Sequence, residues 1–193
     1  MLLLSTHLTT ELRAERFELT PEGIYFPRHG ILAAGEYFGR VNGGAWEKEG
    51  DNLIPTEGLA HLLNVALGST AKPAGYYLAI FSGSAAPAAN WTAASFAAVA
   101  NEIVSMAEGH TGATRPAWTP TNTTTGSIDN MTTVASLTIA TASQLNVTGA
   151  ALLSSSQRGG TTGVLVSASQ YAAPRVFQNG DTYELGYRIN LTV

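Results

Sequence analysis

The chain has 193 residues, enough for one domain with its own hydrophobic core, and it contains no cysteine, so neither a disulfide nor a cysteine-ligated metal can stabilise it. Its formal net charge is -4, and its ten Lys and Arg residues form no cluster, which argues against nucleic-acid binding because that depends largely on clustered cations. The apolar run Leu2–Leu4 is too short for a signal peptide or a membrane span, so we expect no membrane partner.

Charged residues make up only 12% of the chain, about half the usual share. A surface of this composition is weakly solvated, which predicts that part of it packs against identical or different subunits. The alternative is an ordinary soluble sandwich with Thr-rich outer strands. Composition does not separate the two.

Residues 1–50 combine charge with aromatic residues and frequent Gly and Pro. Fourteen of the 24 charged residues lie in positions 1–57. The triplet Asn42-Gly43-Gly44 predicts a hairpin turn that pairs residues 36–41 with Trp46 and its neighbours. We expect residues 1–50 to form an extended attachment arm, followed by a domain over 51–193. The alternative is that residues 15–50 supply the first strands of that domain.

Two helices are predicted in the first part of the domain. Leu59, Leu62, Leu63 and Ala66 follow helical spacing after a Thr56 cap, which predicts a short amphipathic helix over 55–68 packed at the edge of the sandwich. A buried strand is expected over 75–81 and a second helix from Thr92 to about Val104. Residues 108–130 are rich in Gly, Thr, Pro and Asn, which favours a long loop.

The rest of the chain predicts four strands, at 132–140, 146–154, 163–171 and 181–193. In the last of them, apolar and polar residues alternate strictly from Tyr183 to Val193, as in a strand with one buried face. Asn179-Gly180 and the glycines at 159, 160 and 163 predict turns. We therefore expect a mainly β protein: an antiparallel β-sandwich, jelly-roll-like, with one or two short helices.

No pattern of catalytic or metal-binding residues occurs in the chain. The four histidines are isolated, and there is no nucleophile elbow, phosphate loop or dinucleotide fingerprint. We expect no enzymatic activity, no metal and no cofactor. A hydrolase with dispersed residues would need two or more of the carboxylates to meet in one cleft.

Aromatic residues stand next to arginines at several points, a combination found at the anchors of protein interfaces. The alternative is that rings such as Phe17 and Trp118 cover the ends of a small sandwich. The predicted partner-binding residues are Arg13, Arg16, Phe17, Tyr25, Phe26, Arg28, Trp46, Arg115 and Trp118.

The run Asn52-Leu53-Ile54-Pro55-Thr56-Glu57-Gly58-Leu59-Ala60-His61-Leu62-Leu63 resembles an opening motif in small structural proteins of tailed bacteriophages. The resemblance continues through Tyr76–Phe81, Arg115–Trp118, Val147–Leu153 and Asn179–Tyr183, and so covers about residues 51–193. It implies a jelly-roll-like capsid cement or decoration protein. Such a protein binds the major capsid protein on the outer surface of the virion and contacts copies of itself.

Two other functions are compatible with the sequence. One is a tail or fibre component, since similar motifs occur there. The other is a carbohydrate-binding β-sandwich that uses exposed rings of Trp91, Trp118 and Tyr171 as a platform.

Overall fold

A computed structural model of the chain describes residues 17–19, 25–27 and 32–192. Contacts divide the chain into two units. The first comprises residues 1–32 with 191–193, and within it strands β1 (Phe17–Leu19) and β2 (Tyr25–Pro27) pair antiparallel. The second, residues 33–190, is an antiparallel β-sandwich and holds the other described helices and strands, apart from the outer ends of two of them.

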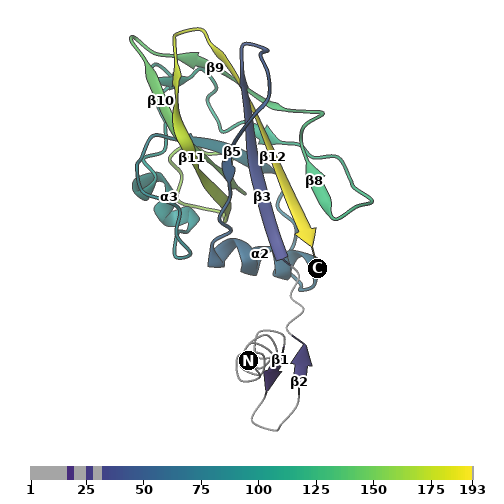
Figure 1. Ribbon diagram of the computed structural model, residues 1–193. Coiled ribbons are helices and arrows are strands. Elements are labelled where there is room, and N and C mark those ends of the chain that lie inside the picture. Colours follow the sequence, from purple (N-terminus) through teal and green to yellow (C-terminus); the bar gives the residue numbers. More distant parts are fainter. Residues whose placement is uncertain (1–16, 20–24, 28–31, 193) are drawn as a thin grey trace, which may run out of the picture. The chain divides into compact units, whose positions relative to one another are not determined.

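Two sheets form the sandwich (Figure 1). The first has the order β11-β10-β5-β7, with β5 (Tyr76–Phe81), β7 (Ala117–Trp118), β10 (Leu145–Leu153) and β11 (Leu165–Phe177). The second has the order β4-β3-β12-β9-β6, and β8 also pairs with β12. Its strands are β3 (Leu32–Val41), β4 (Glu47–Asp51), β6 (Gly109–His110), β8 (Ser127–Asp129), β9 (Ala135–Ala140) and β12 (Thr182–Thr192).

The main core lies between the two sheets. Tyr37 of β3, Ile80 of β5 and Tyr183 of β12 are among its fully buried side chains. A second cluster covers the other face of the four-stranded sheet, where Phe81 contacts Phe96 and Trp91 edge-on. Both faces of β5 are therefore covered, and for this reason its sequence is a continuous apolar run.

In the described part of the chain, two α-helices accompany the sheets: α2 (Thr56–Ala66) and α3 (Ala93–Val99). Thr92 caps α3 by accepting a hydrogen bond from the Ser95 amide, and the Ser95 hydroxyl accepts one from the Thr92 amide. The predicted helix from Thr92 is confirmed but ends at Val99. Before α2 stands Pro55 at the capping position, so the predicted Thr56 cap is wrong.

The expected sandwich is confirmed, and so are the hairpin at Asn42-Gly43 and the four late strands. Asn42 and Gly43 both have positive φ, as a tight hairpin turn requires, and β3 pairs with β4. The loop predicted over 108–130 contains three short strands, β6, β7 and β8, which local sequence did not indicate because each pairs with a distant strand.

The predicted domain boundary near residue 50 is wrong. Both β3 and β4 belong to the larger sheet, so the sandwich begins at Ala33. The alternative, that this region supplies the first strands of the domain, therefore holds for residues 33–50. Side chains on β3 alternate in burial up to Arg40, and Tyr37 lies in the main core. The charges of this segment pair within the sandwich instead of serving an arm: Arg40 with Glu184, and Lys48 with Glu36 and Asp51.

Candidate binding surface at the helical end of the sandwich

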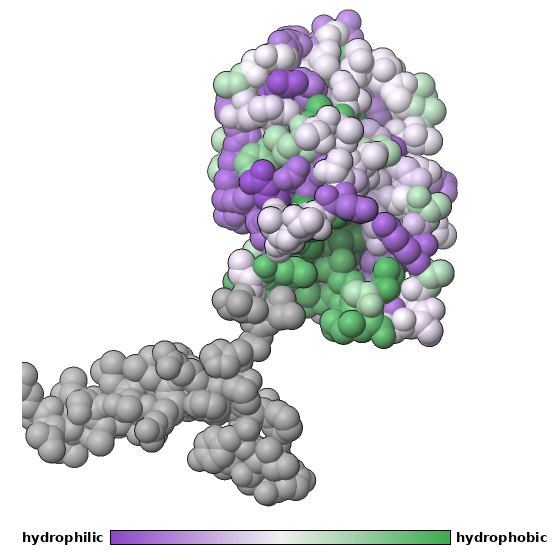
Figure 2. Space-filling model, turned by 90° about the vertical axis from the view of Figure 1, so that its right-hand side faces the viewer, coloured by the Kyte–Doolittle hydropathy of each residue, from purple (hydrophilic) through white to green (hydrophobic). Residues whose placement is uncertain are grey.

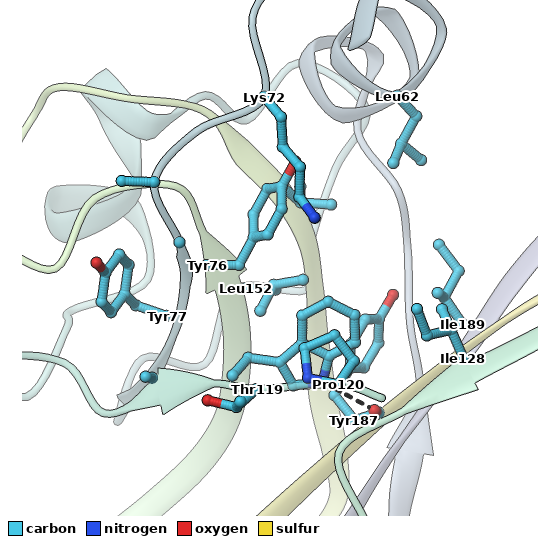
Figure 3. Close-up of a pocket in the computed structure, with 15 residues that line it drawn as sticks. Leu62, Lys72, Tyr76, Tyr77, Thr119, Pro120, Ile128, Leu152, Tyr187 and Ile189 are labelled. Carbon is cyan, nitrogen blue, oxygen red and sulfur yellow. Dashed lines mark hydrogen bonds between the residues drawn. The ribbon is translucent and has the colours of Figure 1, made fainter. Parts of the chain in front are cut away.

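A cavity of about 450 Å³ opens beside α2. We call it the aromatic pocket, because Tyr76 of β5, Trp118 of β7 and Tyr187 of β12 contribute rings to it (Figure 3). Its other lining residues include aliphatic side chains from α2, β8 and β12, namely Leu62, Ile128 and Ile189. Strands of both sheets and helix α2 thus meet at one apolar recess.

The rings of the pocket hold each other in place. The indole Nε1 of Trp118 donates to the backbone oxygen of Tyr187 at 3.0 Å, and the ring centroids of these two residues lie 5.9 Å apart. The Tyr76 ring meets Trp118 edge-on, with centroids 6.2 Å apart. Because Trp118 is only 8% exposed, the pocket is preformed by packing.

The polar atoms of these rings already have partners. The Tyr76 hydroxyl lies 2.9 Å from His61 Nε2, and the Tyr187 hydroxyl accepts from Asn52 Nδ2 at 2.7 Å. Burial lowers the pKa of His61 and raises the pKa of Tyr76 and of Tyr187. All three side chains are therefore neutral at pH 7, and the floor of the pocket carries no charge.

Lys72 is the one charged residue in the lining. It lies on the segment between α2 and β5, and Figure 3 shows its side chain extending toward Tyr76 with the amine over the cavity. No carboxylate of the residues that the structure describes lies within ion-pair distance of Lys72.

Helix α2 turns a row of leucines outward. Leu59, Leu63 and Leu67 are 45%, 61% and 85% exposed and stand four residues apart, so they form one ridge, which we call the α2 ridge. Leu62 of the same helix lines the aromatic pocket. Figure 2 shows hydrophobic surface around a recess at this end of the sandwich.

The expected position of α2 at the edge of the sandwich is confirmed, since α2 lies against the edge strand β11. Its buried residues are Gly58 and His61, not the leucines. A side chain at Gly58 would meet the backbone oxygen of Val166, so the absence of a Cβ allows α2 to lie directly on β11.

A second, polar cavity of about 260 Å³ adjoins the first, since Ile128 lines both. Arg188 and Asp129 form an ion pair in it, with Nε and Oδ2 3.1 Å apart. Its other lining residues carry hydroxyl or amide groups: Thr121, Asn122, Thr123, Thr125 and Ser127. The loop before β8 thus offers hydrogen-bonding groups next to the apolar recess.

The predicted partner-binding residues fall in different places. Trp118 lies in the aromatic pocket, and Trp46 is half-buried beneath the Arg40 guanidinium, 4.7 Å from its ring centroid. The others, apart from Arg115, lie in β1 and β2 without described side chains or outside the described residues: Phe17, Tyr25, Phe26, Arg13, Arg16 and Arg28.

The prediction that Arg115 contacts a partner is wrong for this fold. Arg115 is 1% exposed, and two of its nitrogens donate to the Glu102 carboxylate, each at 2.7 Å. A third nitrogen donates to the backbone oxygen of Ser155. A buried arginine cannot anchor an interface, and this one joins the segment after α3 to the β10–β11 connection.

The rings proposed as a carbohydrate platform are buried. Trp91, Trp118 and Tyr171 are 7%, 8% and 5% exposed, and Trp91 belongs to the cluster beneath α3, apart from the other two. They present no shared flat surface to a sugar ring. This opposes the carbohydrate-binding alternative.

Two carboxylates do lie close together in the sandwich, but both form ion pairs with an arginine. Glu47 and Glu49 both contact Arg175, and the Tyr183 hydroxyl donates to Glu49. None of these carboxylates lines either cavity. Within the described ranges, no three His, Asp or Glu side chains are placed to hold a metal ion, and no helix is long and apolar enough to span a membrane.

No protein-family model matches this chain, and no curated protein matches its sequence.

Sequence reasoning missed most of this surface. Lys72, Tyr76, Ile128 and Ile189 come from four separate segments, and nothing in the local sequence places them together. For α2, a signal was present: apolar residues surround most of the helix, as in Leu59, Leu62 and Val65. A helix that is apolar on more than one face is typical of packing on more than one side.

Proposed function

We propose that this chain is a non-enzymatic structural protein of a tailed-phage virion, a capsid cement or decoration protein that binds the major capsid protein through the α2 ridge and the aromatic pocket. The observation that carries the proposal is the α2 ridge. Leu63 and Leu67 expose more than half of their surface beside an apolar recess. Contiguous exposed apolar surface on a protein with few charges favours a protein-binding role.

The energetics support an interface. Burial of a leucine side chain contributes roughly 1.5–3 kcal/mol, so covering two or three ridge leucines would supply a large part of the free energy of a micromolar complex, about 8 kcal/mol. A capsid offers the same contact many times over, and copies of the chain on neighbouring sites can also touch one another. A modest affinity per site is then enough for dense decoration.

The virion part of the proposal rests on the resemblance of residues 51–193, and the structure gives those residues a framework role. Glu57 Oε2 accepts the backbone N–H of Ala93 at 2.8 Å and of Leu165 at 2.7 Å, which fixes the starts of α3 and β11. Gly58 lets α2 approach β11. The Glu-Gly-Leu motif therefore positions α2 with its leucines outward, which links the resemblance to the proposed surface.

The test begins with purified virions of the phage whose genome carries the gene. Mass spectrometry should find the chain at a fixed ratio to the major capsid protein. Recombinant chain should then bind particles that lack it, and Leu63→Asp should weaken binding at least tenfold because an ionised carboxylate resists burial in an apolar interface.

Met106→Asp provides the matched control, since Met106 is 53% exposed and does not belong to the ridge or the pocket. Both variants should keep the melting temperature of the wild type within a few degrees. Absence of the chain from virions, or equal binding by Leu63→Asp and wild type, would overturn the proposal.

A further inference from the structure

We infer that the aromatic pocket binds an apolar side chain from an acidic peptide segment of the partner, and that Lys72 pairs with a carboxylate of that segment. The inference rests on the proposed function and names the chemistry of the partner at this site. It follows from the charge of the lining, the hydrogen bonds already made by the rings of the floor, and the position of the polar cavity.

Charge complementarity predicts that the ligand carries a negative charge. Among the fifteen residues that line the pocket, Lys72 alone is charged. Elsewhere in the described sandwich, the cations have partners: Arg40, Lys48, Arg115, Arg175 and Arg188 each pair with a carboxylate, and Arg158 donates to four backbone oxygens. Lys72 therefore supplies a positive charge at the edge of an apolar recess, with no carboxylate partner among the described residues.

The aromatic rings of the floor determine which kind of ligand group can bind beneath Lys72. Trp118 Nε1, the Tyr76 hydroxyl and the Tyr187 hydroxyl all have hydrogen-bond partners within the protein. The indole N–H of Trp118 is already used, so a polar group placed over the rings would gain few bonds for the water it loses, whereas an aliphatic or aromatic group would bury apolar surface. The floor thus selects an apolar group, and a volume of about 450 Å³ is within the usual range for small-ligand sites.

The adjoining polar cavity indicates a peptide. Ile128 separates the aromatic pocket from the cavity that Thr123, Ser127 and Arg188 help to line. A ligand whose apolar side chain fills the first cavity would place its flanking backbone or polar side chains over the second, where hydroxyl groups can bond to them. An acidic segment with one large apolar residue satisfies all three regions.

The chain contains two lysines, Lys48 and Lys72, which allows a matched experiment. The probes are 3-phenylpropionate and its uncharged amide, 3-phenylpropanamide, titrated into the full-length protein and followed by the indole N–H signals in two-dimensional NMR. We expect one indole, that of Trp118, to shift with either probe, and the carboxylate to bind about two- to fivefold tighter than the amide.

Lys72→Met should abolish the preference for the carboxylate over the amide. Lys48→Met is the control and should retain the preference, because Lys48 pairs with Glu36 and Asp51 away from the pocket. Failure of both probes to shift any indole, equal binding of the two probes to the wild type, or a preference that persists in Lys72→Met would each overturn the inference.

The particle assay separates this inference from the proposed function. Lys72→Glu should weaken particle binding as Leu63→Asp does. If Leu63→Asp abolishes binding and Lys72→Glu has no effect, the proposed function stands and the acidic-segment inference is wrong. If the wild type does not bind particles at all, the proposed function fails, and the two probes still decide whether the pocket recognises an apolar carboxylate.

Discussion

Arg115 and Trp118 are three residues apart in the sequence but have different roles. Arg115 is the largest side chain that the sandwich buries fully, and its charge is compensated by Glu102. Trp118 lies on β7 and forms part of the pocket. An arginine beside an aromatic residue is typical of an interface. The same two residues can instead be buried in a core when a carboxylate from elsewhere in the chain pairs with the guanidinium.

The structure predicts that Arg115→Met severely destabilises the protein. The substitution would leave the Glu102 carboxylate buried without a cation, a change that typically costs about 3–5 kcal/mol in free energy of unfolding. Urea denaturation followed by circular dichroism measures the loss. Arg188→Met serves as the control: it removes the half-exposed pair with Asp129, and a loss under about 1 kcal/mol is expected. Similar losses in the two variants would contradict this account of the buried pair.

At the scale of elements, α2 shows why helical periodicity alone does not give the orientation of a helix. Leu59, Leu62 and Leu63 fit a buried stripe as well as an exposed ridge. The choice is made by Gly58, which permits a backbone-to-backbone approach to β11, and by His61, which reaches Tyr76. These two residues define the buried face, so Leu59 and Leu63 turn to the surface while Leu62 lines the aromatic pocket.

Gly58→Ala tests this orientation. Replacing glycine by alanine inside a helix usually stabilises it by roughly 0.5–1 kcal/mol. Here the new methyl group would collide with the backbone oxygen of Val166, so we expect a lower melting temperature instead. Asn64→Ala, at an exposed position of the same helix, should leave stability equal or slightly higher. A stabilising Gly58→Ala would show that α2 does not lie against β11 in this way.

Strand β12 shows how far the alternation of apolar and polar residues predicts which side chains are buried. Tyr183, Leu185 and Tyr187 are fully buried, as their alternation predicts. Ile189, which continues the pattern, is only half-buried and lines the aromatic pocket. The sequence predicted the buried face correctly from Tyr183 to Tyr187, but Leu191, predicted on the same face, is 53% exposed.

At the scale of the whole molecule, the sandwich of residues 33–190 contains both hydrophobic clusters. Its sheets are also joined at one edge, where the backbone amide of Leu53 donates to Ala168 and that of Ala168 donates to Leu53. Every described side chain of the two clusters comes from this unit, which is the condition for independent folding.

We therefore predict that removal of residues 1–31 leaves a folded protein. The truncated chain should remain soluble and melt in a single cooperative transition, as judged by calorimetry and size-exclusion chromatography. If residues 1–31 act as an attachment arm, particle binding will fall although the fold is kept. Aggregation or a non-cooperative melt would show instead that these residues are integral to the sandwich.

The sequence by itself determined the fold class of this protein. Two-residue alternation, turn residues such as Asn42-Gly43 and Asn179-Gly180, and the shift to helical spacing at 55–68 are local signals, and local backbone preferences respond to them. Only the tertiary structure decided which residues share a surface. Lys72, Trp118 and Ile189 line one pocket because strands and a helix from distant segments converge at one end of the sandwich, and Arg115 is buried in the core because Glu102 is there to neutralise it. Such juxtapositions depend on long-range pairing, for which neighbouring residues carry no signal.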